Sequence, residues 1–234
     1  MNSTEIIGYT TDGDTYCVNC YRAAAADVEA SSGCDAAEFD DAPIFAGAEF
    51  DSPAHCGHCS ELLDGQSLTR DGQRYVAERI AEYITDDRGD CDTLAIWSDL
   101  TDHSYSSTDL ELARGCYSSI GQTYSHGTLR PVDLLEAAID AAQALHDWIA
   151  YTPAYHRNDT SMCADLQCRM ADAEQAIAAV CDPETVEDDS DEDGLWYALE
   201  SIADAINEHL PPPLYYGARD GDGSDIAIQV SAED

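Results

Sequence analysis

Two pairs of cysteines have the spacing of metal ligands. Of the ten cysteines in the chain, Cys17 and Cys20 form one CxxC pair, and Cys56 and Cys59 form another. Two residues between cysteines let both sulfur atoms of a tight turn face one ion, while backbone N–H groups stabilise the thiolates. Two such turns supply four sulfurs to a tetrahedral ion, each at about 2.3 Å. The spacing therefore predicts a metal site formed by Cys17, Cys20, Cys56 and Cys59.

Redox chemistry is the main alternative, because the string CGHC at residues 56–59 is also the active-site string of protein disulfide isomerases. Such a site needs its CxxC at the start of a substantial helix within a βαβ framework, because the helix N-terminus lowers the pKa of the thiol. Only Ser60 to Leu63 separate Cys59 from the turn residues Asp64 and Gly65. A lone dithiol also leaves the first pair unexplained. Metal binding is favoured. The ion would be zinc, with a rubredoxin-like iron site or uncoordinated cysteines as the open alternatives.

Two histidines flank the second pair and could each replace a cysteine. Four cysteines already fill a tetrahedral site, so we expect His55 and His58 to lie near the ion without binding it.

The cysteine pairs also carry a family resemblance. Each follows a β-type stretch, and residues 1–65 resemble the zinc-ribbon family, in particular small CxxC…CxxC proteins of haloarchaea and their viruses. The resemblance implies structural zinc bound by the four cysteines. Family ribbons usually have glycine after each pair, where this chain has Tyr21 and Ser60. The 35 residues between Cys20 and Cys56 exceed the usual spacing and imply an inserted helix and loop.

The charge of the chain restricts its surroundings and partners. Its 234 residues include 48 acids and ten bases, all of them arginine, for a net charge of −38. Molar salt shortens the Debye length to about 3 Å, so a lysine-free acidic surface suits a high-salt cytoplasm. A DNA mimic is the rival explanation, but it would concentrate its acids. Here 19 acids lie in residues 1–90 and 29 in residues 91–234. The composition resembles that of proteins from halophilic archaea or their viruses.

The same features bear on location and on binding partners. Scattered arginines in a negative field form no basic patch, which disfavours direct nucleic-acid binding. The N-terminus lacks the basic and apolar parts of a signal peptide, and no run of 18 apolar residues could span a membrane. We expect a cytoplasmic or virion-associated protein that does not insert into membranes.

Periodicity predicts an α+β fold. An N-terminal zinc-ribbon-like β region precedes a central and C-terminal antiparallel helical bundle, and a β-hairpin ends the chain. The expected domains are residues 1–68, 69–210 and 211–234. The expected elements are a hairpin at 5–17, a helix at 21–30, a β run at 43–50, a helix capped by Thr69, short helices at 93–100 and 107–120, helices starting at Pro131, at Ser161 and after Gly194, and strands at 214–218 and 225–230.

Two stretches combine aromatic residues with few charges. Residues 101–130 and 141–170 each have a net charge of −1. They are either core or a contact surface for a protein partner, since interface centres are rich in aromatics and poor in charge. In the second case the contact residues are Tyr105, Tyr124, Trp148 and Tyr155.

No catalytic residues can be named, because no nucleophile, base and orienting group share a recognisable spacing. The sequence thus favours a non-enzymatic zinc-binding protein that binds a protein partner. The alternatives are an acidic DNA mimic that inhibits a nucleic-acid-binding enzyme, and an enzyme using the Tyr- and His-rich residues 101–156.

Overall fold

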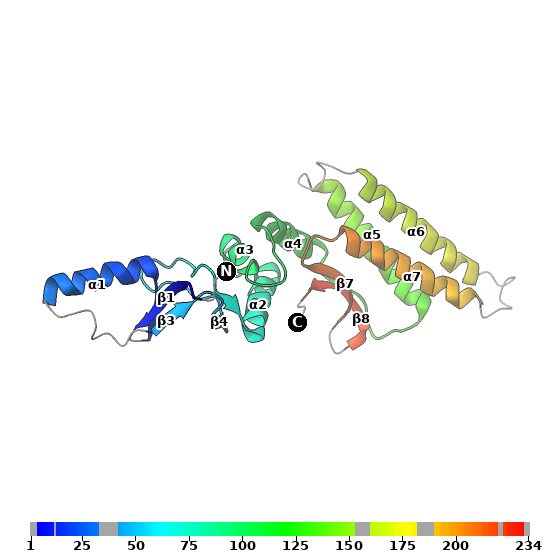
Figure 1. Cartoon of the computed structure of the whole chain (residues 1–234). Coiled ribbons are helices and arrows are strands. Elements are labelled where there is room, and N and C mark those ends of the chain that lie inside the picture. The colour runs from blue at the N-terminus through cyan, green and yellow to red at the C-terminus, as the bar shows by residue number, and fades with distance from the viewer. Residues whose placement is uncertain are drawn as a thin grey trace. The chain divides into compact units, whose positions relative to one another are not determined.

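A computed structural model describes residues 4–11, 13–32, 42–152, 160–181, 190–219 and 222–231 (Figure 1). It confirms the α+β class, with antiparallel strands near both ends of the chain and helices between them. The chain forms two compact units. Unit 1 comprises residues up to Ile80 together with Asp92–Tyr105, and unit 2 comprises Ala81–Cys91 and Ser106–Ser231. The three domains expected from the sequence stay a prediction.

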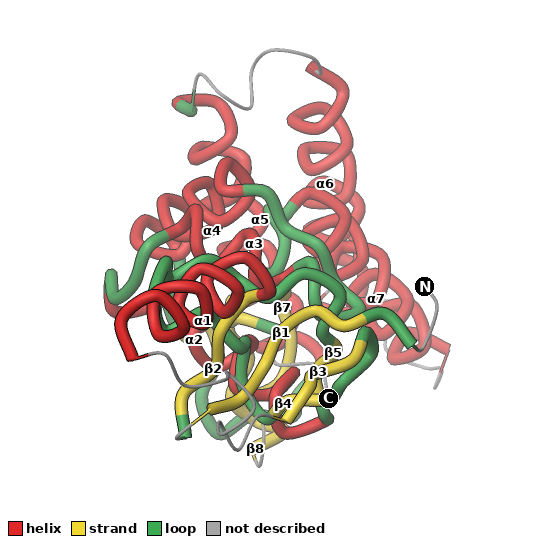
Figure 2. The backbone as a smooth tube through the Cα atoms, turned by 60° about the vertical axis from the view of Figure 1, so that its left-hand side comes forward, coloured by secondary structure: helices red, strands yellow, loops and turns green. Residues whose placement is uncertain are grey.

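Unit 1 begins with a three-stranded antiparallel sheet in the order β2-β1-β3. Its strands are β1 (Ile6–Thr11), β2 (Asp14–Cys17) and β3 (Ala42–Phe45). Gly13, at φ +89°, supplies the left-handed conformation that the tight turn between β1 and β2 requires. The ring of Tyr9 in β1 stacks on that of Tyr21 in helix α1 (Val18–Ser32), with 4.0 Å between centroids. Helix α1 accordingly packs along β1 and β2 (Figure 2).

A smaller parallel pair and two helices complete unit 1. The elements are β4 (Glu49–Phe50), β5 (Ser67–Leu68), α2 (Arg70–Asp86) and α3 (Cys91–Ser98). The last six residues of α2 and the first residue of α3 belong to unit 2. The single β run expected at 43–50 is instead two strands in different sheets, because Gly47 at φ +81° turns the chain between them. Buried apolar side chains of this unit include Ile44, Leu63, Leu68, Val76, Ile80 and Leu94.

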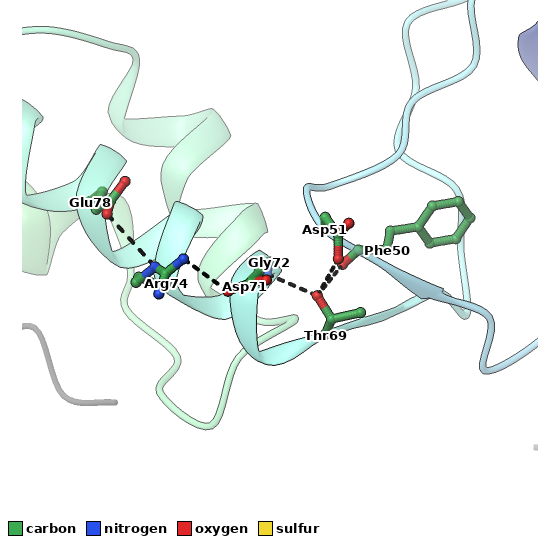
Figure 3. A network of polar contacts seen from close by, with 7 residues as sticks. All are labelled: Phe50, Asp51, Thr69, Asp71, Gly72, Arg74 and Glu78. Carbon is green, nitrogen blue, oxygen red and sulfur yellow. Dashed lines mark hydrogen bonds and ion pairs between the residues drawn. The ribbon is translucent and has the colours of Figure 1, made fainter.

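Helix α2 begins at the cap that the sequence predicts. The Thr69 hydroxyl accepts the N–H of Gly72 at 3.1 Å and donates to Asp51 Oδ1 at 2.7 Å (Figure 3). Asp71 and Arg74 form an ion pair at 2.8 Å on the exposed side of the first turns. The cap satisfies an otherwise unpaired N–H of the first turn and ties the helix to the residue that follows β4.

Unit 2 combines helices with a second sheet. Its elements are α4 (Ser107–Ile120), β6 (Thr123–Ser125), α5 (Pro131–Tyr151), α6 (Thr160–Cys181), α7 (Ser190–His209), β7 (Leu214–Arg219) and β8 (Asp222–Val230). Helices α5, α6 and α7 pack against one another, and the sheet, in the order β6-β8-β7, contacts α5 and α7. The core includes Leu135, Leu145, Ile149, Leu166, Ile202, Ile206 and Ile228. None of the described helices is both long and apolar enough to cross a membrane.

Helix boundaries in unit 2 follow local chemistry. Ser106 accepts the N–H of Asp109 at 3.1 Å, and the Asp109 carboxylate accepts the N–H of Ser106 at 2.9 Å, which together form a capping box for α4. Pro131 occupies the first turn of α5, as expected. Helix α7 starts at Ser190, so the expectation of a start after Gly194 is wrong. A glycine inside a helix costs only about 1 kcal/mol, and here that cost does not stop the helix.

A helix side chain pairs with the edge strand β7. Asn207 of α7 accepts the N–H of Tyr216 at 2.7 Å and donates to the carbonyl of the same residue at 3.1 Å. The Asn207 amide thus makes the two bonds that a neighbouring strand would make.

Candidate metal centre

The structure brings the four predicted cysteines together. Their sulfur atoms all lie within 4.8 Å of one another, and those of Cys17 and Cys59 are 4.0 Å apart. A tetrahedral ion with bonds of about 2.3 Å requires sulfurs about 3.8 Å apart, so small side-chain shifts would close the site on an ion. Within the described residues, this is the one group of three or more potential ligands close enough to share an ion.

The first pair stands where a strand becomes a helix. Cys17 is the last residue of β2, and α1 begins at Val18, three residues before the start expected from the sequence. The N–H of Cys20 donates to the Cys17 sulfur at 3.4 Å. Unpaired N–H groups and the helix dipole favour negative charge at this end of a helix. The helix start therefore places a backbone N–H group beside the first cysteine pair.

The second pair lies in the irregular loop between β4 and β5. The N–H of Cys56 donates to the Glu61 carbonyl and that of Ser60 to the Cys56 carbonyl, both at 2.8 Å. The N–H of Gly57 donates to the carbonyl of Thr15 in β2 at 2.7 Å. This last bond attaches the second turn to the strand that ends in Cys17, which aligns the two pairs.

A buried glutamine, which the sequence analysis missed, holds the base of this loop. Gln66 is 6% exposed, and its side chain accepts the N–H of Ala54 at 2.7 Å. It also donates to the carbonyls of Ala54 at 3.0 Å and Leu63 at 2.8 Å. Both ends of the turn are thereby fixed by one amide. No local sequence signal marks this role, since an isolated glutamine is usually a surface residue.

Neither nearby histidine belongs to the sulfur cluster. Both ring nitrogens of His55 are engaged, Nδ1 with the Ser60 carbonyl at 3.0 Å and Nε2 with the indole N–H of Trp97 at 3.1 Å. His58 is exposed and outside the group of close ligand atoms. That the cysteines alone bind the ion stays a prediction.

The protein environment favours a thiolate on one sulfur of the cluster. Burial by itself raises the pKa of the Cys56 thiol. Hydrogen bonds from backbone N–H groups, first that of Cys17 and then that of Cys59, outweigh burial and lower the pKa to about 6. The side-chain hydrogen bond with Cys17, followed by burial, raises the pKa of Cys20 to about 12. Such N–H donors stabilise the thiolates that bind soft metal ions.

These thiols are badly arranged for disulfide exchange. The attacking sulfur in that chemistry must be both a thiolate and accessible. Cys56, whose pKa is lowered, is only 1% exposed. For the exposed Cys59, the backbone N–H of Glu61 lowers the pKa, but partial desolvation and the bond with Cys56 outweigh it and the net shift is upward. No helix follows Cys59 until α2 begins at Arg70.

Ser60 stands where zinc ribbons usually have glycine, and its backbone is in the left-handed region. Its φ is +61°, in the left-handed region that costs an ordinary residue about 1–2 kcal/mol. Replacing Ser60 by glycine removes this strain but adds unfolded-state entropy. We expect Ser60→Gly to raise the free energy of unfolding by about 0.5–1 kcal/mol, measured by urea denaturation.

A matched control is Ser119→Gly in the right-handed helix α4, where glycine should lower stability by about 0.5 kcal/mol. A loss of stability in Ser60→Gly similar to that of the control would contradict the role assigned to the left-handed turn.

The remaining described cysteines form no second centre. Cys116 is buried in α4, and burial raises its pKa to about 12. Cys163 and Cys168 lie on α6 and belong to no group of three or more close ligand atoms among the described residues. Cys34 and the side chain of Cys181 fall outside the described residues.

The aromatic residues of 101–156 range from the half-buried Tyr124 to Tyr151, which is 85% exposed. Tyr124 donates its hydroxyl to the Ile120 carbonyl at 2.9 Å and packs edge-on against the buried ring of Tyr216. Tyr105 and Trp148 are half-buried, and Tyr155 lies outside the described residues. Binding of a partner through this region stays a prediction.

Comparison of the chain with models of protein families, with curated proteins and with solved structures gave no match. The resemblance of residues 1–65 to zinc ribbons is therefore a likeness of motif. The chemistry of the centre must be argued from its own side chains.

Proposed function

We propose that this chain is a zinc-binding protein in which one Zn²⁺, bound by Cys17, Cys20, Cys56 and Cys59, stabilises unit 1. The observation that carries the proposal is the convergence of four sulfurs from two distant segments to within 4.8 Å. Four soft sulfur ligands this close together suit zinc, and zinc is the ion that the motif resemblance implies.

The role supported best is structural. Four protein ligands fill a tetrahedral site, which leaves no position for a substrate or an activated water. Cys17 and Cys20 come from the β2–α1 junction, whereas Cys56 and Cys59 come from the β4–β5 loop. An ion bound by all four would join these segments, and its binding free energy would add to the stability of the fold.

The wider role, for which the sequence favours contact with a protein partner, is part of the same proposal. A zinc-stabilised unit without an open coordination position is consistent with a binding rather than a catalytic protein. The acidic DNA mimic and an enzyme of unknown reaction are alternatives that no contact described above favours.

Metal analysis of the full chain, purified without chelators, tests the proposed centre. We expect one zinc per chain, and we expect the number of thiols that react rapidly with a disulfide reagent to rise by four when a strong chelator is added. Iron in place of zinc would change the identity of the ion. A metal-free protein whose thiol reactivity does not respond to added zinc would contradict the proposal.

A further inference from the structure

The ring of His55 connects the second cysteine turn to helix α3. Its Nε2 lies 3.1 Å from the indole nitrogen of Trp97, and its Nδ1 lies 3.0 Å from the Ser60 carbonyl oxygen. An indole nitrogen can only donate, and a carbonyl oxygen can only accept. Nε2 must therefore be the unprotonated nitrogen and Nδ1 the protonated one, so the two contacts assign the tautomer of His55.

The bond to Ser60 acts on the residue that shapes the turn. Ser60 directly follows Cys59, has φ +61°, and donates its own N–H to the carbonyl of Cys56. A strained backbone conformation persists only where its surroundings hold it. His55 holds the carbonyl of Ser60 while Cys56 holds its N–H.

We propose that Trp97 and His55 are positioning residues of the metal centre, which keep Cys56 and Cys59 turned toward the other pair before the ion binds. This inference rests on the proposed zinc site. Trp97 belongs to α3, 38 residues after Cys59, and its indole offers no ligand atom to an ion. It acts through His55, as groups behind metal ligands commonly do.

Packing keeps the Trp97 indole in place. Its ring centroid is 5.8 Å from that of His55 and 6.1 Å from that of Tyr75 on α2. Tyr75 thus shares the aromatic cluster but donates no hydrogen bond to His55. Phenylalanine at position 97 would keep a ring in the cluster and remove only the N–H donor.

The test compares zinc affinities of the full chain, measured by competition with a chromophoric chelator. Trp97→Phe should weaken zinc binding about tenfold, because the metal-free turn loses the bond that orients His55. The control Tyr75→Phe keeps the Trp97 N–H donor and an aromatic ring at position 75. Its zinc affinity should stay within about twofold of the wild type. Equal affinities in wild type and Trp97→Phe would overturn the positioning role while leaving the zinc site intact.

A second measurement needs no variant. The ¹⁵N resonances of the neutral His55 imidazole in the zinc-loaded wild type should show protonated Nδ1 and unprotonated Nε2. A ring protonated at Nε2 instead would overturn the inference, whether or not Trp97→Phe folds. Absence of zinc from the wild type would overturn the proposed function, and the two failures are thereby distinguishable.

Discussion

Replacing Cys56 by serine is expected to weaken zinc binding about a hundred- to a thousandfold and to loosen the cysteine region of unit 1. A structural zinc site contributes about 10–16 kcal/mol over four ligands, so one ligand is worth about 2.5–4 kcal/mol, or about a hundred- to a thousandfold in affinity. Serine is a poor zinc ligand, and its hydroxyl would leave the N–H donors around Cys56 without a thiolate. Zinc content and affinity are the direct measurements.

Amide hydrogen exchange would show how far the local unfolding extends along the chain. In Cys56→Ser we expect faster exchange at Gly57 and Ser60, whose N–H groups hold the turn, and unchanged protection at Leu145 and Ile206 in the core of unit 2. Cys168→Ser is the matched control, because Cys168 is exposed on α6 and outside the cluster. A Cys56→Ser protein that binds zinc as tightly as this control would refute the ligand assignment.

Replacing Gly72 by alanine is expected to destabilise unit 1 by about 2–3 kcal/mol, the usual cost of overpacking. Helix propensity alone predicts the opposite sign, since alanine exceeds glycine by about 1 kcal/mol inside a helix. In this structure, however, a Cβ at Gly72 would overlap the carbonyl oxygen of Phe50 and lie 3.2 Å from the Cβ of Leu68. Both neighbours belong to the β4–β5 pair, so the helix would have to move away from it.

Gly115→Ala provides the comparison for this prediction. Gly115 is exposed within α4, and a Cβ there would meet no atom within 4 Å. This variant should gain about 0.5–1 kcal/mol, as propensity alone predicts. Chemical denaturation of both variants measures the difference, and stabilisation in Gly72→Ala would show that the approach of β4 to α2 is looser than described.

Local signals in the sequence predicted most elements of this fold. The turn glycine Gly13, the cap Thr69 and the helix-initiating Pro131 each act within a few residues, so their effects can be recognised without knowledge of the tertiary structure. The two CxxC pairs were informative for the same reason. Each spacing encodes a ligand geometry within one turn, and two pairs imply a common ion.

Features that depend on distant partners could not be predicted in this way. Strand β6 has three residues, too few for a period, and exists because it pairs with β8 about a hundred residues later. The contact between His55 and Trp97 spans 42 residues, and the role of Gln66 depends on the loop that it closes. Such roles follow from packing, which a local pattern does not contain.

The bonds between Asn207 and Tyr216 bear on how this protein behaves when crowded with its own copies. An open strand edge is a template for adding a strand from another chain, and proteins often guard it with charge, lysine especially. This chain has no lysine, and in molar salt its many acids repel other molecules over only about 3 Å. The Asn207 amide occupies the edge groups of Tyr216 by hydrogen bonding, which salt does not screen. At Tyr216, the edge of β7 is therefore occupied by contacts that do not depend on charge repulsion.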